Sequence, residues 1–154
     1  MSKRHARGFT LIELIFFIVV VGVGLAGIVS VSTTVVKSSA EPMVRKQALA
    51  VAQSLLEEIL LKNYSRPTDS TAVSFANGGT RNQFDTVTDY IGYNTAGGIV
   101  DVTGTAVAGL GSYNFTPVVT VAPDTLGTLA VLKVVVSVTG PQGVVTLTGY
   151  RGNY

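Results

Sequence analysis

The sequence predicts an α+β protein in which one long N-terminal helix packs on a small antiparallel β-sheet. Three observations support this fold class. An apolar run without charge covers residues 14–36, a one-sided apolar pattern follows over residues 44–60, and segments rich in Val, Thr and Tyr fill the C-terminal third. An all-round apolar helix that becomes amphipathic must change its surroundings along its length. The β-rich segments supply the sheet on which its second half can pack.

Composition and charge exclude several classes of function. The chain has 154 residues and a formal net charge of +2. Three of its 11 basic residues, Lys3, Arg4 and Arg7, stand at the N-terminus, which leaves 8 against 9 acidic side chains. No basic stripe with interleaved aromatics is present, so no nucleic-acid partner is expected. The absence of cysteine excludes disulfides and thiolate metal sites.

The apolar run is about as long as the 20 or so residues that a helix needs to cross a bilayer. Basic residues precede it and a polar sequence follows it. This asymmetry predicts a single-pass anchor in a lipid bilayer, with the N-terminus in the cytoplasm. A secretory signal would carry its small-residue cleavage site after the apolar run, whereas Gly8 lies before it. One carboxylate, Glu13, stands inside the segment, where an isolated charge is costly.

The six residues from Gly8 to Glu13, GFTLIE, resemble the processing junction of type IV pilin and pseudopilin precursors. In that family a prepilin peptidase cuts after the glycine and N-methylates the new first residue. The resemblance implies that cleavage falls between Gly8 and Phe9, that Phe9 is N-methylated, and that Glu13 is the fifth mature residue and acts in filament assembly. The implied partners are the prepilin peptidase, other pilins or minor pilins in a filament, and an inner-membrane assembly platform.

A physical argument from Glu13 agrees with this resemblance. A lone carboxylate in hydrocarbon favours a cationic partner. Cleavage would create one, the amine of Phe9, about one helical turn away on the same helix. In a staggered bundle Glu13 would instead meet the amine of a neighbouring subunit. Such a pair would fix the axial register, because a misplaced subunit leaves buried charges unpaired.

Past Lys37 the helix is expected to continue with one apolar face. The apolar positions recur at spacings of three and four: Val44, Ala48, Ala52, Leu55, Leu56, Ile59 and Leu60. Pro42 is expected to kink or restart the helix, and the segment that contains Pro67 to end it. Glu41 with Arg45, and Glu58 with Lys62, have the spacing of favourable ion pairs on one helix.

These signals divide the chain into four segments. We expect a cleaved basic leader over residues 1–8, a transmembrane or filament-core helix over 9–36, an amphipathic continuation over 37–62, and a β-rich head over 63–154. In the head, strands are expected over 113–121, 129–139 and 144–150. The turns between them are expected at Pro123 to Gly127 and at Gly140 to Gly143. A long helix laid on an antiparallel sheet also resembles the pilin head.

The sequence offers no catalytic set. The single histidine, His5, lies in the leader, and no phosphate loop, dinucleotide fingerprint or Ser-His-Asp set is present. Asp85, Asp89 and Asp101 match no calcium-loop spacing, so we predict no metal, no cofactor and no enzymatic activity. Phe84 and Tyr90, which flank two of these carboxylates, are expected to pack on the helix.

Three further stretches indicate a particular group within this family. Residues 39–42, 52–60 and 84–90 are similar to minor pilins of mannose-sensitive haemagglutinin (MSHA) pilus systems. The expected function is that of a minor pilin or pseudopilin, which is held in the bacterial inner membrane with a periplasmic head and then enters a type IV pilus. Two alternatives remain open. One is a pseudopilin of a type II secretion system, and the other is a membrane-anchored binding domain that never assembles.

Overall fold

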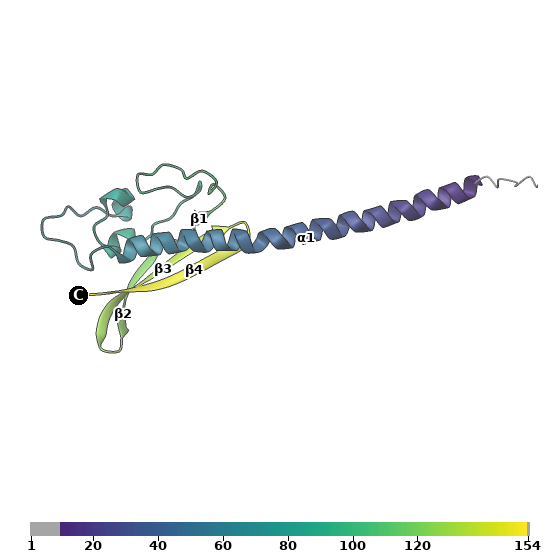
Figure 1. The fold of residues 1–154 in the computed structure, drawn as a ribbon. Coiled ribbons are helices and arrows are strands. Elements are labelled where there is room, and N and C mark those ends of the chain that lie inside the picture. Colours follow the sequence, from purple (N-terminus) through teal and green to yellow (C-terminus); the bar gives the residue numbers. More distant parts are fainter. Residues whose placement is uncertain (1–9, 154) are drawn as a thin grey trace, which may run out of the picture. The chain divides into compact units, whose positions relative to one another are not determined.

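The computed structural model describes residues 10–153, and for residues 33–40 it describes the backbone alone. The chain divides into two compact units, Met1–Ala40 and Glu41–Tyr154. The elements are one long α-helix, three short 3₁₀ helices and four β-strands (Figure 1). The α+β, pilin-like fold class predicted from the sequence is confirmed.

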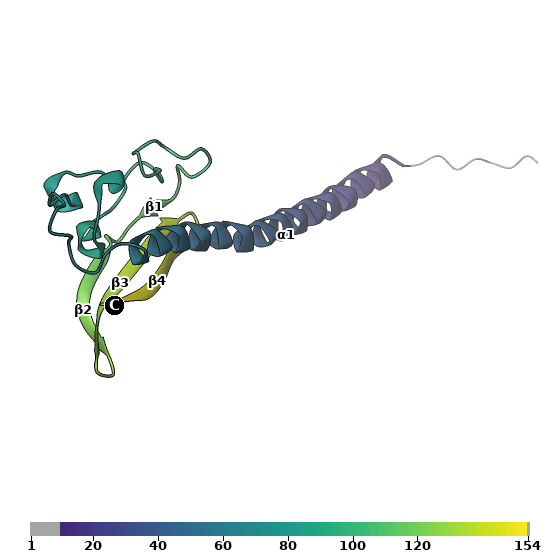
Figure 2. The same cartoon turned by 60° about the vertical axis from the view of Figure 1, so that its left-hand side comes forward.

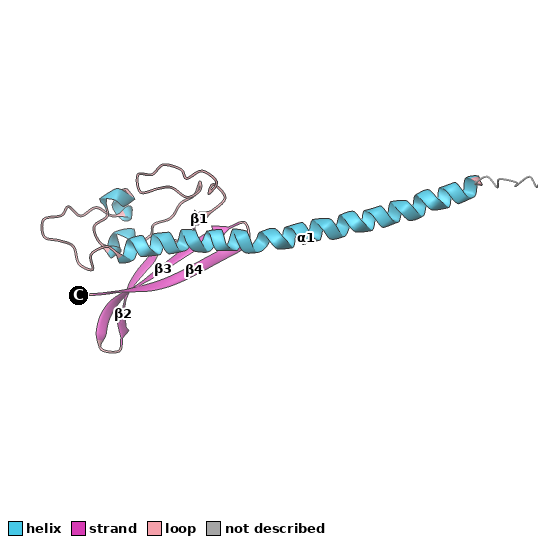
Figure 3. Ribbon diagram, in the orientation of Figure 1, coloured by secondary structure: helices cyan, strands magenta, loops and turns pink. Residues whose placement is uncertain are grey.

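The helix α1 runs over Leu11–Leu60 and includes Pro42 (Figure 3). The helical assignment passes through Pro42 without a break, so the predicted restart at this residue does not occur. The end is close to the predicted one, because the chain leaves the helix before Asn63, whose backbone pairs with Thr86.

In the second unit, α1 buries the apolar face that the sequence predicts. Ala48, Ala52, Leu55 and Ile59 are almost inaccessible to solvent. The opposite face of this part of α1 carries exposed side chains such as Gln53. The apolar stripe therefore packs on its own head, as its spacing predicts.

Four antiparallel strands form the sheet (Figure 2). They are β1 (Asn114–Phe115), β2 (Thr120–Leu126), β3 (Leu129–Gly140) and β4 (Gly143–Gly152). The long strand β3 is central, because β1 and β2 pair with one of its edges and β4 pairs with the other. Val134 and Val136 of this central strand are fully buried.

Two strand predictions need correction. The first predicted strand is split into β1 and β2 around Pro117, because a proline cannot donate a hydrogen bond to a ladder. Pro123 lies inside β2 rather than in a turn. It is tolerated there because β2 is an edge strand, where a missing N–H can face away from the neighbouring strand. The predicted turn between Gly140 and Gly143 is confirmed.

The three 3₁₀ helices lie between α1 and the sheet in sequence: η1 (Phe75–Asn77), η2 (Arg81–Gln83) and η3 (Val87–Tyr90). Phe84 and Tyr90 are buried and meet edge to face, with ring centroids 4.9 Å apart. Both belong to the core cluster that includes the buried face of α1. Their predicted packing on the helix is confirmed.

Candidate functional site

The predicted assembly site lies at the beginning of α1. Gly8 and Phe9, the predicted cleavage and methylation positions, lie outside the described residues. Glu13 lies in the first turn of α1, and its side chain is exposed. A carboxylate is favourable there because the first turn of a helix carries the positive end of the helix dipole.

Thr10 caps the start of the helix, and sequence reasoning did not single it out. The backbone N–H of Glu13 donates to Thr10 Oγ1 at 3.4 Å, and that of Leu14 donates to the Thr10 carbonyl at 3.2 Å. The pattern Thr-x-x-Glu from Thr10 to Glu13 is typical of a capping box, and this signal could have located the helix start. Glu13 therefore has a local structural setting in addition to its predicted assembly role.

The segment behind Glu13 is apolar and uncovered. Leu11–Ser32 is long and apolar enough to cross a membrane, with a mean hydropathy of 2.9, and none of it is buried in the protein. Large side chains such as Phe16, Val23 and Leu25 are each more than half exposed. A continuous apolar surface of this size marks a contact with a membrane or with another protein.

Three glycines in this segment leave open space beside the helix. A Cβ atom added at Gly22, Gly24 or Gly27 would meet no atom of this chain within 4 Å, apart from its own helix backbone and sequence neighbours. The helix nevertheless runs through all three positions. Because each glycine costs about 1 kcal/mol of helix propensity relative to alanine, their presence favours close approach of another helix.

At its other end, α1 is fixed to the head by a polar cluster. Glu58 accepts hydrogen bonds from Tyr90 Oη at 2.7 Å and from Arg81 Nε at 3.1 Å, and forms an ion pair with the same arginine. Arg81 also donates to the Val100 carbonyl. The helix pairing of Glu58 with Lys62 that its spacing suggests is replaced by this contact with Arg81, 23 residues away.

Burial and hydrogen bonding shift the pKa of Glu58 in opposite directions. Burial alone would raise the pKa of Glu58, but the bonds from Arg81 and Tyr90 outweigh it and hold that pKa below its ordinary value. For Tyr90, burial and the Glu58 carboxylate both raise the pKa of the phenol. The charged carboxylate and the neutral phenol are thus the forms that the folded head prefers.

The acidic residues of the head have structural roles. Asp89 is almost fully buried, accepts backbone N–H groups of Asp85 and Thr86 at 3.0 and 2.9 Å, and forms an ion pair with Arg66. Asp101 accepts the backbone N–H groups of nearby threonines and closes an exposed turn. Within residues 10–153, no group of three potential metal ligands comes together. These carboxylates therefore order loops.

Comparison with known proteins gives one match. Residues 3–29 match the family described as "Prokaryotic N-terminal methylation motif". No curated protein and no solved structure matches the chain. The matched segment includes the predicted processing junction and most of the apolar part of α1. The match supports the resemblance of this segment to the N-terminal segment of type IV pilins and pseudopilins.

Proposed function

We propose that this chain is a minor pilin that takes part in the assembly of a type IV pilus of the MSHA kind. A prepilin peptidase cleaves after Gly8 and N-methylates Phe9. The mature subunit is then drawn by an inner-membrane assembly platform into a filament with other pilins. One observation carries the proposal: the segment that matches the methylation motif includes most of an apolar helix surface that no described part of the chain covers.

In this proposal Glu13 is the register residue. Cleavage leaves a charged amine on Phe9, about one helical turn before Glu13 or opposite it on a neighbouring subunit. Inside a filament core both charges are far from water, so a subunit at the wrong height leaves two charges unpaired. Removing one partner of a buried ion pair typically costs about 3–5 kcal/mol, which is sufficient to select the axial position.

The proposed topology follows from the basic leader. Positive residues stay on the cytoplasmic side, so residues 1–8 face the peptidase and the head, residues 63–154, lies in the periplasm. Residues 9–36 are held in the inner membrane until they enter the filament core, and residues 37–62 form the amphipathic continuation under the head.

Mass spectrometry of the mature chain tests the proposal. The chain is produced in cells with and without prepilin peptidase and purified from membranes. We expect a mature N-terminus at N-methyl-Phe9 only when the peptidase is present, and no processing of a Gly8→Val variant. An intact Met1 in the presence of an active peptidase would overturn the proposal in favour of a plain membrane anchor.

The MSHA assignment and the minor role have a separate test. Deletion of the gene is expected to reduce surface MSHA pili and leave type II secretion unchanged, and the purified filament is expected to contain the chain at a small fraction of the major subunit. Loss of secretion with normal pili would instead assign the chain to a type II secretion pseudopilus.

A further inference from the structure

The outer edge of β4 is open along its length. Among the described residues β4 pairs only with β3. The ladder begins where Gly143 lies opposite Gly140 and ends where Gly152 lies opposite Val131. No other described backbone hydrogen bond reaches residues 144–150. Natural proteins protect such edges with proline, lysine, bulges or a covering segment, because an unpaired strand is a template for another strand.

The two sides of the sheet differ in this protection. The free side of β2 carries Pro123, which removes a donor, and its beginning is occupied by the loop residues Gly92 and Tyr93, which bond to Val119. The sequence of β4, GVVTLTGYRG, contains neither proline nor lysine. β4 is therefore the edge that is left able to accept a partner strand.

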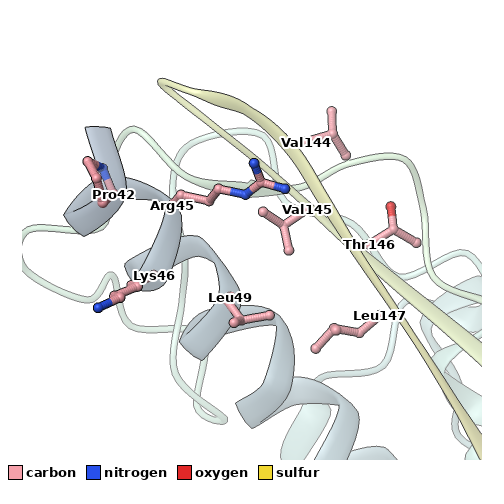
Figure 4. Close-up of a pocket in the computed structure, with 8 residues that line it drawn as sticks. All are labelled: Pro42, Arg45, Lys46, Leu49, Val144, Val145, Thr146 and Leu147. Atoms are coloured by element: carbon pink, nitrogen blue, oxygen red, sulfur yellow. The ribbon is translucent and has the colours of Figure 1, made fainter. Parts of the chain in front are cut away.

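A groove runs beside this edge (Figure 4). It has a volume of about 520 Å³ and lies between the part of α1 from Pro42 to Leu49 and the β4 residues Val144 to Leu147. Residues from both faces of β4 line the groove and none comes from β3, so it lies along the free edge of the strand. In Figure 4, Leu49, Val145 and Leu147 point toward one another across it.

One basic side chain lies at the rim of the groove. Arg45 reaches from α1 toward Val144 and Val145, whereas Lys46 lies on the same part of the helix with its amino group pointing away from β4 (Figure 4). Among the described side chains, neither forms an ion pair, and the Glu41–Arg45 pair expected from their spacing is not formed. The groove thus combines an apolar floor, a strand edge that pairs with no other described strand, and the cation of Arg45, to which no described carboxylate is paired.

We propose that this groove binds an extended segment of another protein, which adds to β4 as a fifth strand of the sheet. Alternate apolar side chains of the segment fill the space above Leu49, Val145 and Leu147, and carboxylates near one end pair with Arg45. Antiparallel addition, the commoner and slightly more stable pairing, places those carboxylates at the C-terminal end of the segment.

The charges and the backbone favour this occupant over two others. In an antiparallel β4–β4 pair of two copies, the partner strand would bring no carboxylate to Arg45, because β4 contains no acidic residue. A lipid surface offers phosphates but no extended backbone, so the strand edge would stay unpaired. An acidic extended segment supplies both backbone groups that pair with β4 and carboxylates that pair with the cation at the rim.

A defined peptide tests the proposal on the full-length chain in detergent micelles. The probe is fluorescent acetyl-(Val-Thr)₃-Glu-Glu-amide, and a matched control ends in Lys-Lys. Fluorescence anisotropy should show saturable binding of the Glu-Glu peptide, weakened at least about 10-fold by Arg45→Glu and by replacing Glu-Glu with Lys-Lys. Lys133→Glu makes the same change in net charge on β3, away from the groove, and should leave the affinity unchanged.

Backbone methylation of the probe separates strand addition from charge attraction. Two versions carry N-methyl groups on alternate amides, one on each edge of the extended peptide. Only one version should lose binding, because only one edge of the probe can pair with β4. Equal binding of both versions, equal binding of the acidic and basic peptides, or no saturation up to about 1 mM would overturn the proposal.

Vesicles of phosphatidylglycerol provide the competing outcome. If Arg45→Glu removes a preference of the chain for phosphatidylglycerol over phosphatidylcholine vesicles while the peptide does not bind, Arg45 serves a lipid surface and the proposal is wrong. These measurements do not depend on processing at Gly8 or on filament entry, so their outcome is separate from that of the assembly proposal.

Discussion

The two halves of α1 belong to one helix but differ in the exposure of their apolar side chains. From residue 10 to residue 32 every residue is exposed, including long apolar side chains. From Ala48 to Ile59 the apolar positions are buried in the head. Apolar side chains therefore stabilise the fold in the second half, whereas no described part of the chain buries the large apolar side chains of the first half.

Because of this difference, we expect the second half of α1 to contribute to the stability of the head and the first half to contribute to assembly. Substitutions in the second half of α1 should act on the head, whereas those in the first half should act only where another molecule covers the helix. All six tyrosines lie at or beyond residue 64 and the chain has no tryptophan. Tyrosine fluorescence during urea unfolding of the detergent-solubilised chain therefore reports on the head alone.

The largest expected effect comes from a matched pair of leucines. Leu55 is 1% exposed and Leu25 is 58% exposed, on the same helix. Leu55→Ala should destabilise the head by about 2–5 kcal/mol, because it removes buried methyl groups and leaves a cavity. Leu25→Ala should change head stability by less than about 0.5 kcal/mol. Equal losses in urea unfolding would show that the first half also packs on the head.

A second pair compares two carboxylates on α1. Glu58→Gln should cost the head about 1–3 kcal/mol in the same urea titration, because it leaves the charge of Arg81 half-buried without its partner. Glu13→Ala should leave head stability, membrane insertion and leader cleavage unchanged, but lower filament incorporation at least about 10-fold. Immunoblots of sheared filaments measure that loss, and normal incorporation would remove Glu13 from its proposed role.

A third pair compares two glycines. A Cβ atom at Gly149 would lie 2.9 Å from Leu60 Cδ1 and 3.1 Å from Leu56 Cδ1, so Gly149→Ala should destabilise the head by about 1 kcal/mol. Gly24→Ala meets no atom of this chain outside its own helix turn. It should leave head unfolding unchanged and reduce filament yield if another helix approaches there, and unchanged yield would exclude such an approach.

The smallest effect is on pH dependence. The lowered pKa of Glu58 means that the folded head prefers the charged carboxylate. Its contribution is present above the ordinary value of 4.5 and is lost as the pH falls through the lower folded pKa. Urea midpoints between pH 7 and pH 3 should fall less steeply for Glu58→Gln than for the natural chain. Parallel curves would contradict this role.

Features that depend on local sequence patterns could be predicted from the sequence. Features that depend on contacts between residues distant in sequence could not. Spacing alone identifies the buried positions Ala48, Leu55 and Ile59, and the glycines of the Gly140–Gly143 turn mark a hairpin. Both depend on neighbours in sequence, whose geometry is fixed by the helix or the turn.

The missed features depend on tertiary context. The place of Pro123 inside β2 depends on that strand being at an edge, which hydrophobic alternation does not encode. Glu58 pairs with Arg81 rather than with Lys62. This pairing depends on the tertiary contact that brings η2, which contains Arg81, next to the helix. The cap at Thr10 is predictable from the pattern Thr-x-x-Glu, but the same residues also belong to the processing motif, so the pattern alone does not separate the two roles.

The bond that joins the two ends of the head has a consequence for biosynthesis. Arg151 Nε donates to the Lys62 carbonyl at 3.1 Å across 89 positions of sequence. In the proposed topology the N-terminus stays in the cytoplasm and the head is exported in chain order, so the apolar face of α1 reaches the periplasm before β3 and β4, whose side chains pack in the same core. Closing so long a loop is slow relative to local structure. If the head is exported in this order, the apolar face is exposed to solvent until the sheet follows it, and a chain truncated before residue 143 should be cleaved faster by periplasmic proteases because it lacks β4.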